Sequence, residues 1–201
     1  LTLICPPNAE LSQIAAKEGI EVTTLPIDRK TFNGLFAMRR WFGQHLAGVD
    51  VINTHSSTDS WLTALALATL PRGVPVVRTR HVSTAVNRSV ATRWLYQRAT
   101  QHIVTTGEAL RRQLHRDNGY ALDSMTSVPT GIDLNRFEPL NREGCRTALG
   151  LEATTNLIGI VATLRDWKGH SYLFEAMQIL SACHPELQLL VIGDGPYEPT
   201  L

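Results

Sequence analysis

The sequence lacks the features that define several classes of protein. Cysteine is scarce: the 201 residues contain three, Cys5, Cys145 and Cys183, which are far apart and without CxxC spacing. We therefore expect free or buried thiols, with neither a disulfide framework nor a zinc site. No apolar run approaches the roughly 20 residues that a membrane-spanning helix needs. The formal net charge is only +1, so no field of one sign predicts a nucleic-acid partner.

The composition that remains is that of a soluble globular protein, with 43% hydrophobic and 18% charged residues. Basic residues concentrate between Arg72 and Arg98. Such a run typically coats a solvated face, and a contact with phosphates or an anionic membrane surface is the alternative. The chain opens without Met, inside a strand-like run, and no signal peptide precedes Leu1. We therefore expect the natural protein to begin further upstream.

Short apolar runs alternate with helical patterns, which predicts βαβ units and a parallel sheet. Two candidate capping boxes, Ser56-x-x-Asp59 and Thr105-x-x-Glu108, each precede a helical pattern. The pattern predicts strands over residues 1–5, 20–25, 49–54, 74–78, 102–105, 124–128, 157–162 and 187–192. It predicts helices after both boxes and over residues 10–18, 32–47, 93–99 and 170–182.

The pattern weakens around residues 138–151, where Pro139, Gly144 and Gly150 occur. This predicts a domain boundary that separates residues 1–150 from residues 151–201. The second part contains two strands and one helix, which cannot close a stable sheet alone.

Ligands of an open parallel sheet bind beyond the carboxyl ends of the strands, so the loops after the predicted strands are the candidate sites. None of these loops has the spacing of a Walker P-loop, a GxGxxG fingerprint or a nucleophile elbow. All are polar, glycine-containing or basic, and they cover residues 53–59, 78–81, 129–133, 165–170 and 193–196.

Three of the segments resemble motifs of family 4 glycosyltransferases, in the family's order. Val128-Pro129-Thr130-Gly131-Ile132-Asp133 with Arg136-Phe137 resembles "P-N-G-[IV]-D…R-F". Leu164-Arg165-Asp166-Trp167-Lys168-Gly169-His170 resembles the "R-L-x-x-x-K-G" loop. Leu189-Leu190-Val191-Ile192-Gly193-Asp194-Gly195-Pro196 resembles "L-x-[IV]-[VI]-G-D-G-P". Each motif alone is weak, whereas the three together are specific and the resemblance covers the whole chain.

The resemblance implies an α/β protein of the GT-B fold, built from two Rossmann-like domains. Residues 1–150 would be the acceptor-side domain without its first strand, and residues 151–201 the start of the nucleotide-sugar-binding domain. The implied activity is that of a hexosyltransferase, which transfers a sugar from an NDP-sugar with retention of configuration. No cofactor and no obligatory metal are implied, and the sequence has no Asp-x-Asp. The family's Glu-x7-Glu segment would lie beyond Leu201, so we expect these residues alone to be inactive.

The resemblance also implies partners and a location. The acceptor would be a glycan or a lipid-linked molecule, such as the lipopolysaccharide core, and no nucleic acid is expected. The location would be cytoplasmic, with peripheral contact at the inner face of the membrane. The helix around Met38-Arg39-Arg40-Trp41-Phe42 could provide that contact, although a core-facing helix is favoured. Trp61 and Trp94 have helical spacing and are expected in the core.

The resemblance assigns the donor phosphates to Arg165, Lys168 and Gly169, where cations precede a helix N-terminus. The family's usual arginine is Thr163 here, and Arg165 would replace it from two residues further on. The alternative is a pair of surface cations that cap a turn. His81 matches a family histidine near the transferred sugar and is the candidate catalytic residue. Its alternative is a loop histidine that is hydrogen-bonded to backbone.

The remaining candidates are loop residues with less specific signals. Gly131 and Gly195 are expected to form tight turns, and Asp194 to cap the helix that follows it. His55 and Ser56 have a helix-capping loop as their alternative. The candidate ligand-loop residues are Thr130, Gly131, Asp133, Gly193, Asp194 and Gly195, and the candidate acceptor-side residues are His55, Ser56 and Arg80.

Two other functions remain open. A nucleotide-sugar epimerase of the GT-B type would need carboxylates and a histidine acting on the donor sugar, and no such cluster is present. A non-catalytic module that binds a sugar or a protein would fit the missing donor half. A Rossmann dehydrogenase is disfavoured, because no visible strand is followed by GxGxxG.

Overall fold

The computed structural model describes residues 1–201, and its internal contacts divide the chain into two units, Leu1–Gly131 and Ile132–Leu201. Each unit is described separately. The division lies just beyond the last strand of the first unit. The domain boundary at residue 150 stays a prediction.

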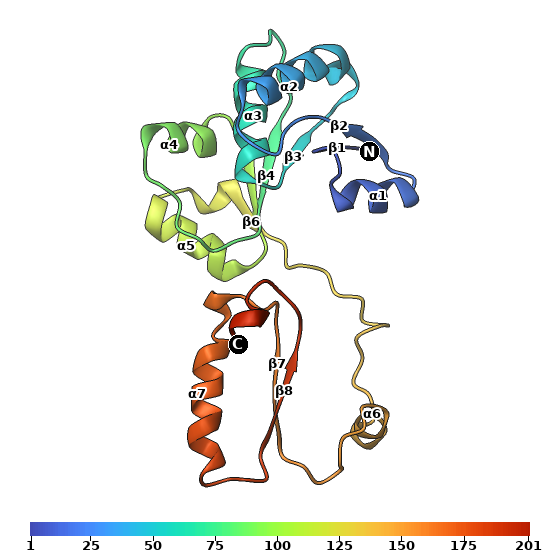
Figure 1. The fold of residues 1–201 in the computed structure, drawn as a ribbon. Helices are drawn as coiled ribbons and strands as arrows, with labels where there is room; N and C mark the ends of the chain where they lie inside the picture. The colour runs from blue at the N-terminus through green and yellow to red at the C-terminus, as the bar shows by residue number, and fades with distance from the viewer. The chain divides into compact units, whose positions relative to one another are not determined.

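Unit 1 alternates strands and helices along the chain (Figure 1). Strands β1 and β2 pair in parallel, and β3, β4, β5 and β6 form a second parallel sheet in that order. The predicted βαβ alternation is confirmed. The elements are β1 (Thr2–Cys5), α1 (Glu10–Lys17), β2 (Glu21–Thr24), α2 (Phe32–His45), β3 (Ile52–Thr54), α3 (Ser57–Ala68), β4 (Val76–Arg80), α4 (Val90–Gln97), β5 (His102–Thr105), α5 (Glu108–Asn118) and β6 (Met125–Ser127), with 3-10 turns at Leu46–Gly48 and Leu122–Ser124.

The capping box before α3 is confirmed. The Ser56 hydroxyl accepts from the backbone N–H groups of Thr58 and Asp59, at 3.1 and 3.2 Å. The Asp59 carboxylate in turn accepts from the backbone N–H of Ser56 at 2.8 Å. This reciprocal pair satisfies N–H groups that the helix itself cannot bond, so the chain enters α3 at a defined residue.

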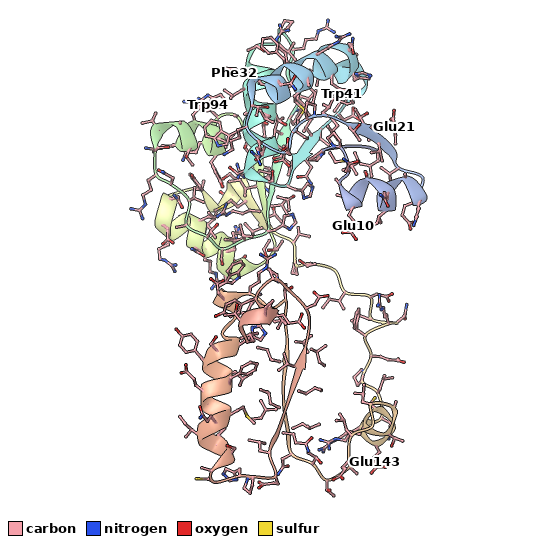
Figure 2. All side chains as sticks on the ribbon, viewed as in Figure 1. Glu10, Glu21, Phe32, Trp41, Trp94 and Glu143 are labelled. Carbon is pink, nitrogen blue, oxygen red and sulfur yellow. The ribbon has the colours of Figure 1, made fainter.

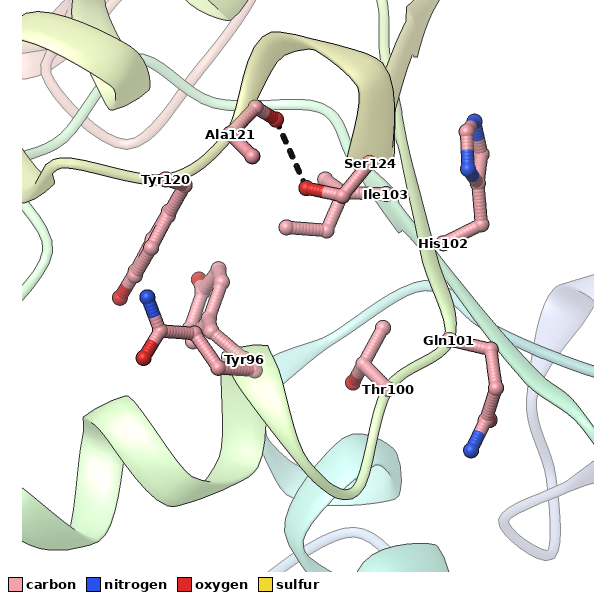
Figure 3. A pocket seen from close by; sticks show the side chains of 9 residues that line it. Tyr96, Thr100, Gln101, His102, Ile103, Tyr120, Ala121 and Ser124 are labelled. Carbon is pink, nitrogen blue, oxygen red and sulfur yellow. Dashed lines mark hydrogen bonds between the residues drawn. The ribbon is translucent and has the colours of Figure 1, made fainter.

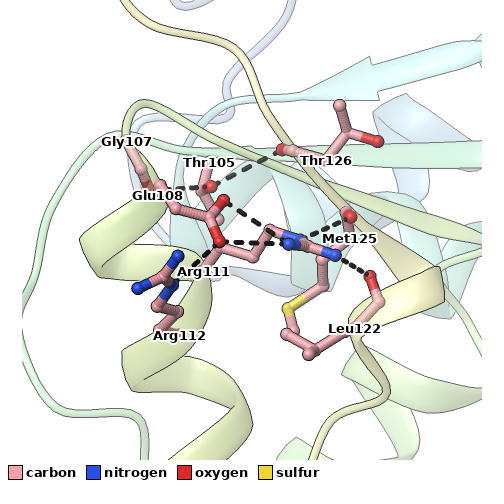
Figure 4. Close-up of polar contacts among 8 residues, drawn as sticks. All are labelled: Thr105, Gly107, Glu108, Arg111, Arg112, Leu122, Met125 and Thr126. Carbon is pink, nitrogen blue, oxygen red and sulfur yellow. Dashed lines mark hydrogen bonds and ion pairs between the residues drawn. The ribbon is translucent and has the colours of Figure 1, made fainter.

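The second predicted box is wrong. Gly107, not Thr105, is the N-cap residue of α5, and the Thr105 hydroxyl donates to the carbonyl of Gly107 instead (Figure 4). Thr105 is fully buried as the last residue of β5, so its side chain serves the strand end. The spacing fits a capping box, but Thr105 still belongs to β5 and therefore cannot cap α5.

Arg111 ties α5 to the connection that leads into β6 (Figure 4). Its guanidinium donates to the carbonyls of Met125 and Leu122, both at 2.9 Å, and pairs with Glu108 at 3.2 Å. A hydrogen bond from Arg112 and the charge of Arg111 lower the pKa of Glu108. These contacts hold in place the strand from which the 129–133 loop departs.

Several boundaries differ from the prediction: β3, for example, begins at Ile52 and not at Val49, and for two other elements the cause is local. β4 begins at Val76 and not at Val74, since Pro75 has no N–H for the ladder, and it continues to Arg80. α4 begins at Val90 and not at Arg93, because Ser89 caps it by accepting from the Thr92 N–H at 3.2 Å.

Two clusters form the core of unit 1. One joins α4 and α5 to the middle strands through residues that include Leu95, Ile103 and Leu114. Trp61 and Trp94 pack against it with their rings 6.3 Å apart, although both remain partly exposed. The other cluster joins α2 and α3.

α2 is the expected core-facing helix. Met38 and Phe42 are 2% and 1% exposed, whereas Arg39 and Arg40 lie on the outer side. Arg39 donates from Nε to the Thr69 hydroxyl at 3.0 Å, which links α2 to the end of α3.

Unit 2 has one βαβ element, as predicted, and a helix that was not predicted. β7 (Leu157–Val161) and β8 (Gln188–Ile192) are parallel and joined through α7 (His170–Ser181). The unpredicted helix is α6 (Arg142–Ala148), which Asn141 caps by accepting from the Gly144 N–H at 2.9 Å. Unit 2 also has 3-10 turns at Asp166–Lys168 and Glu198–Thr200. Only Leu164 and His170 are buried in this unit.

All three cysteines are free, as expected, with Cys5 buried and Cys183 exposed. Burial raises the pKa of the Cys5 thiol. None of the helices has the length and apolar character needed to cross a bilayer.

Candidate functional site

The candidate residues gather at the carboxyl ends of strands. In unit 1, His55 follows β3, His81 follows β4, and Thr130 lies beyond β6. In unit 2, the 165–169 loop follows β7 and the 193–195 turn follows β8. Parallel strands bring these ends to one edge of each sheet.

The rings of His55 and His81 are paired in the structure. Nδ1 of His55 lies 3.0 Å from Nε2 of His81, and the ring planes stack at 19° with centroids 5.3 Å apart. Burial, followed by the charge of His81, lowers the pKa of His55 from its ordinary 6.5, and Asp59 partly opposes the shift. The sequence suggested each histidine separately, and their contact was not predicted.

Ser56 serves the fold locally. Its hydroxyl accepts the two N–H bonds that begin α3, and its backbone N–H donates to Asp59. The same carboxylate accepts from the backbone N–H of His55 at 2.9 Å. Asp59 therefore anchors the backbone that carries His55.

Arg80 is buried inside unit 1 and is not an exposed acceptor-side cation. It is 9% exposed and donates to the Tyr96 hydroxyl at 3.1 Å and to the carbonyl of Thr84. Arg78 is 5% exposed, with its guanidinium 4.4 Å from the centre of the Tyr96 ring. Burial lowers the pKa of Arg78 and raises that of the adjoining Tyr120 to about 12. The basic run is therefore not wholly a solvated face.

The 129–133 loop holds candidates on both sides of the division between the units. Thr130 is exposed, and the Asp133 carboxylate accepts from the backbone N–H groups of Asn135 and Arg136, at 3.0 and 3.3 Å. Gly131 has no positive φ and open space around it. The expectation of a tight turn at Gly131 is therefore wrong, because the chain there does not require glycine.

In unit 2, the loop after β7 and the turn after β8 are joined through their backbones. The N–H of Leu164 donates to the carbonyl of Asp194 at 2.7 Å, and that of Tyr197 to the carbonyl of Leu164 at 3.2 Å. Gly193 and Gly195 have φ of 144° and 158°, and a Cβ on either would collide with the backbone of Ala162 or Leu164. The expected turn at Gly195 is confirmed.

Asp194 does not cap the helix that follows. The element that follows is the 3-10 turn Glu198–Thr200. Its N-cap residue is Tyr197, and no side chain caps it. The backbone carbonyl of Asp194 carries the contact to Leu164 instead.

The cations of the 165–169 loop are exposed at the start of α7. Gly169 has φ of 83°, which turns the chain so that α7 begins at His170. Arg165 lies 5.4 Å from the centre of the Trp167 ring, and the Lys168 side chain has no partner. A twelve-residue helix directs its free N–H groups and its positive dipole end at this point, so an anion there meets both the helix and Lys168.

His170 is a feature that the sequence did not signal. It is fully buried at the first position of α7, and neither ring nitrogen has a hydrogen-bond partner.

A pocket of about 260 Å³ lies on the far side of Tyr96, the residue whose hydroxyl accepts from Arg80 (Figure 3). Tyr96, Gln101, His102, Tyr120 and Ser124 are among its lining residues. Since Gln101 precedes β5 and Ser124 precedes β6, the pocket opens at the amino ends of the strands. No candidate from the sequence lines it.

Solved structures share this arrangement of strands and helices. A glycosyltransferase from Rickettsia africae superposes with a TM-score of 0.77 at 18% identity, over 99% of this chain and 54% of that one. Anabaena Alr3699/HepE, solved with UDP and glucose, gives a TM-score of 0.70 at 17% identity, over 99% of this chain and 55% of that one. The fold is therefore the GT-B fold of glycosyltransferases, as predicted.

Comparison of the sequence assigns the family. Residues 1–136 match Glycosyltransferase Family 4, and residues 141–201 match Glycosyl transferases group 1. The chain belongs to Glycosyltransferase Family 4, and the predicted resemblance is confirmed.

Curated relatives are longer than this chain. A D-inositol 3-phosphate glycosyltransferase of Segniliparus rotundus is 25% identical over 94% of the chain, which corresponds to 45% of that protein. A GDP-mannose-dependent monoacylated alpha-(1-6)-phosphatidylinositol monomannoside mannosyltransferase of Corynebacterium glutamicum is 39% identical over 37% of the chain and 20% of its own length. The matched segments thus cover less than half the length of either relative.

Proposed function

We propose that the chain is part of a hexosyltransferase that transfers a sugar from an NDP-sugar, with retention, to a glycan or lipid-linked acceptor. The donor would bind at unit 2, and the acceptor at the loops of unit 1. The 201 residues alone would be inactive, and no metal would be obligatory.

The observation that carries the proposal is the junction of two loops in unit 2. The bond from Leu164 to Asp194 holds the glycine-rich turn beside the loop that bears Lys168. The same loop ends at the N-terminus of α7 and carries the exposed cation Lys168. That combination suits a diphosphate, whose charge grows as the bond to the sugar breaks.

Relatives support a nucleotide-sugar donor but do not identify it. HepE was solved with UDP and with UDP-glucose, while the relative from Corynebacterium is named as GDP-mannose-dependent. Both nucleotides therefore belong in the first assay.

The proposal is tested with a protein of the relatives' full length that contains this chain. UDP- and GDP-sugars are incubated with it, with and without inositol phosphate, phosphatidylinositol and lipopolysaccharide-core acceptors. We expect release of free nucleoside diphosphate only when an acceptor is present, with the anomeric configuration of the sugar retained in the product. Interconversion of NDP-sugars without acceptor would indicate an epimerase, and binding without any turnover would indicate a binding module.

We also propose peripheral contact with an anionic membrane through α2. Phe32 and Phe36, one turn of α2 apart, are 84% and 68% exposed. Phe32 is the first residue of the helix (Figure 2). Lys30, Arg39 and Arg40 lie exposed around them. Exposed aromatics beside cations are the composition of a surface-binding helix.

Vesicles test the membrane contact. Replacing Phe32 and Phe36 with serine is expected to reduce co-sedimentation with phosphatidylglycerol vesicles several-fold. The matched control replaces Leu11 and Ile14, two exposed apolar residues of α1, with serine and should bind like the wild type. If the Phe32/Phe36 variant bound the vesicles as well as the wild type, α2 would not be the membrane contact.

A further inference from the structure

The contact between His55 and His81 joins the ends of two neighbouring parallel strands. Thr54, just before His55, pairs with Arg78 in β4, and His81 directly follows the end of β4. A distance of 3.0 Å between Nδ1 of His55 and Nε2 of His81 leaves room for one hydrogen between them. One ring must therefore donate while the other accepts.

The ring of His55 is held from its backbone. The N–H of His55 donates to Asp59, which also closes the capping box of α3. His55 therefore directly precedes Ser56, the N-cap residue of α3, and both residues donate a backbone N–H to Asp59. No such contact fixes the ring of His81, which is exposed on the 81–89 segment. Of the two, His55 is the residue that can orient its partner.

We propose that His55 is a positioning residue for His81: it holds a single hydrogen between the rings and so selects one tautomer and one orientation of His81. Nδ1 of His81 is then the ring nitrogen left for a ligand. The assignment of that ligand as the reacting sugar or acceptor rests on the proposed function, whereas the pairing itself does not.

The hydrogen bond between the rings requires a hydrogen on one of the two facing nitrogens and a lone pair on the other. When both facing nitrogens carry hydrogen, the bond is lost.

The pairing is tested by NMR on this chain with ¹⁵N-labelled histidine. We expect the neutral His81 to show one tautomer in the wild-type chain. In His55→Ala, the neutral His81 should become a mixture of tautomers. His102→Ala, which removes an imidazole bonded to Thr126, is the control and should leave His81 unchanged.

Activity measurements on the longer protein distinguish a positioning role of His55 from a purely structural role. His55→Ala should lower kcat by about tenfold to a hundredfold, the range known for residues that orient another functional group, with little change in KM. His55→Asn, which keeps a hydrogen-bonding side chain, should restore part of the rate.

An unchanged tautomer of His81 in His55→Ala would overturn the proposal. A His81 tautomer that depends on His55, in a protein that transfers no sugar, would leave the pairing intact and refute the proposed function instead.

Discussion

Replacing Lys168 with alanine in the full-length enzyme is expected to lower kcat/KM for the NDP-sugar by about 10²- to 10³-fold. This is the range for losing one group that stabilises charge developing in a transition state. Lys168 is exposed and directly precedes Gly169, the residue that caps the N-terminus of α7. The measurement is the release of nucleoside diphosphate at saturating acceptor.

Two further variants test whether the effect is specific to the charge and geometry of Lys168. Lys168→Arg keeps the charge and should retain more activity than Lys168→Ala, although its different geometry should not restore the full rate. Arg142→Ala removes an exposed cation on α6 in the same unit and should leave the rate unchanged. A Lys168→Ala enzyme with wild-type kcat/KM would show that Lys168 is an ordinary surface cation at a turn.

Replacing Gly195 with alanine is expected to open the junction between the two loops of unit 2. At φ of 158° a side chain is strained, and its Cβ would also press into the backbone of Leu164. The two effects together should destabilise the junction by more than about 2 kcal/mol. Gly193→Ala should act in the same way against Ala162.

Amide hydrogen exchange of Leu164 measures how far the junction is destabilised. The N–H of Leu164 donates to Asp194, so loss of about 2 kcal/mol should accelerate its exchange by roughly 30-fold. Gly131→Ala is the matched control, because Gly131 has open space and no positive φ, and it should leave the exchange unchanged. Wild-type protection in Gly195→Ala would show that the junction does not depend on glycine.

Local patterns were sufficient for much of the fold. The alternation of apolar runs and helical spacing predicted the parallel sheets, because burial of one helix face or of a whole strand leaves a periodic trace in the sequence. Ser56-x-x-Asp59 was predicted as a capping box and is one, since all its partners lie within four residues. Thr105-x-x-Glu108 has the same spacing but failed, because the sheet keeps Thr105 in β5.

The sequence by itself determined the family, the βαβ alternation and the loops in which the candidate residues lie. Only the tertiary structure decided what those residues do within the loops. It buried Arg78 and Arg80 against Tyr96, brought His55 to His81, and placed Gly193 and Gly195 against a neighbouring loop. Each of these contacts joins segments that are distant in the chain, and the distance between such segments is set by strand pairing rather than by local composition.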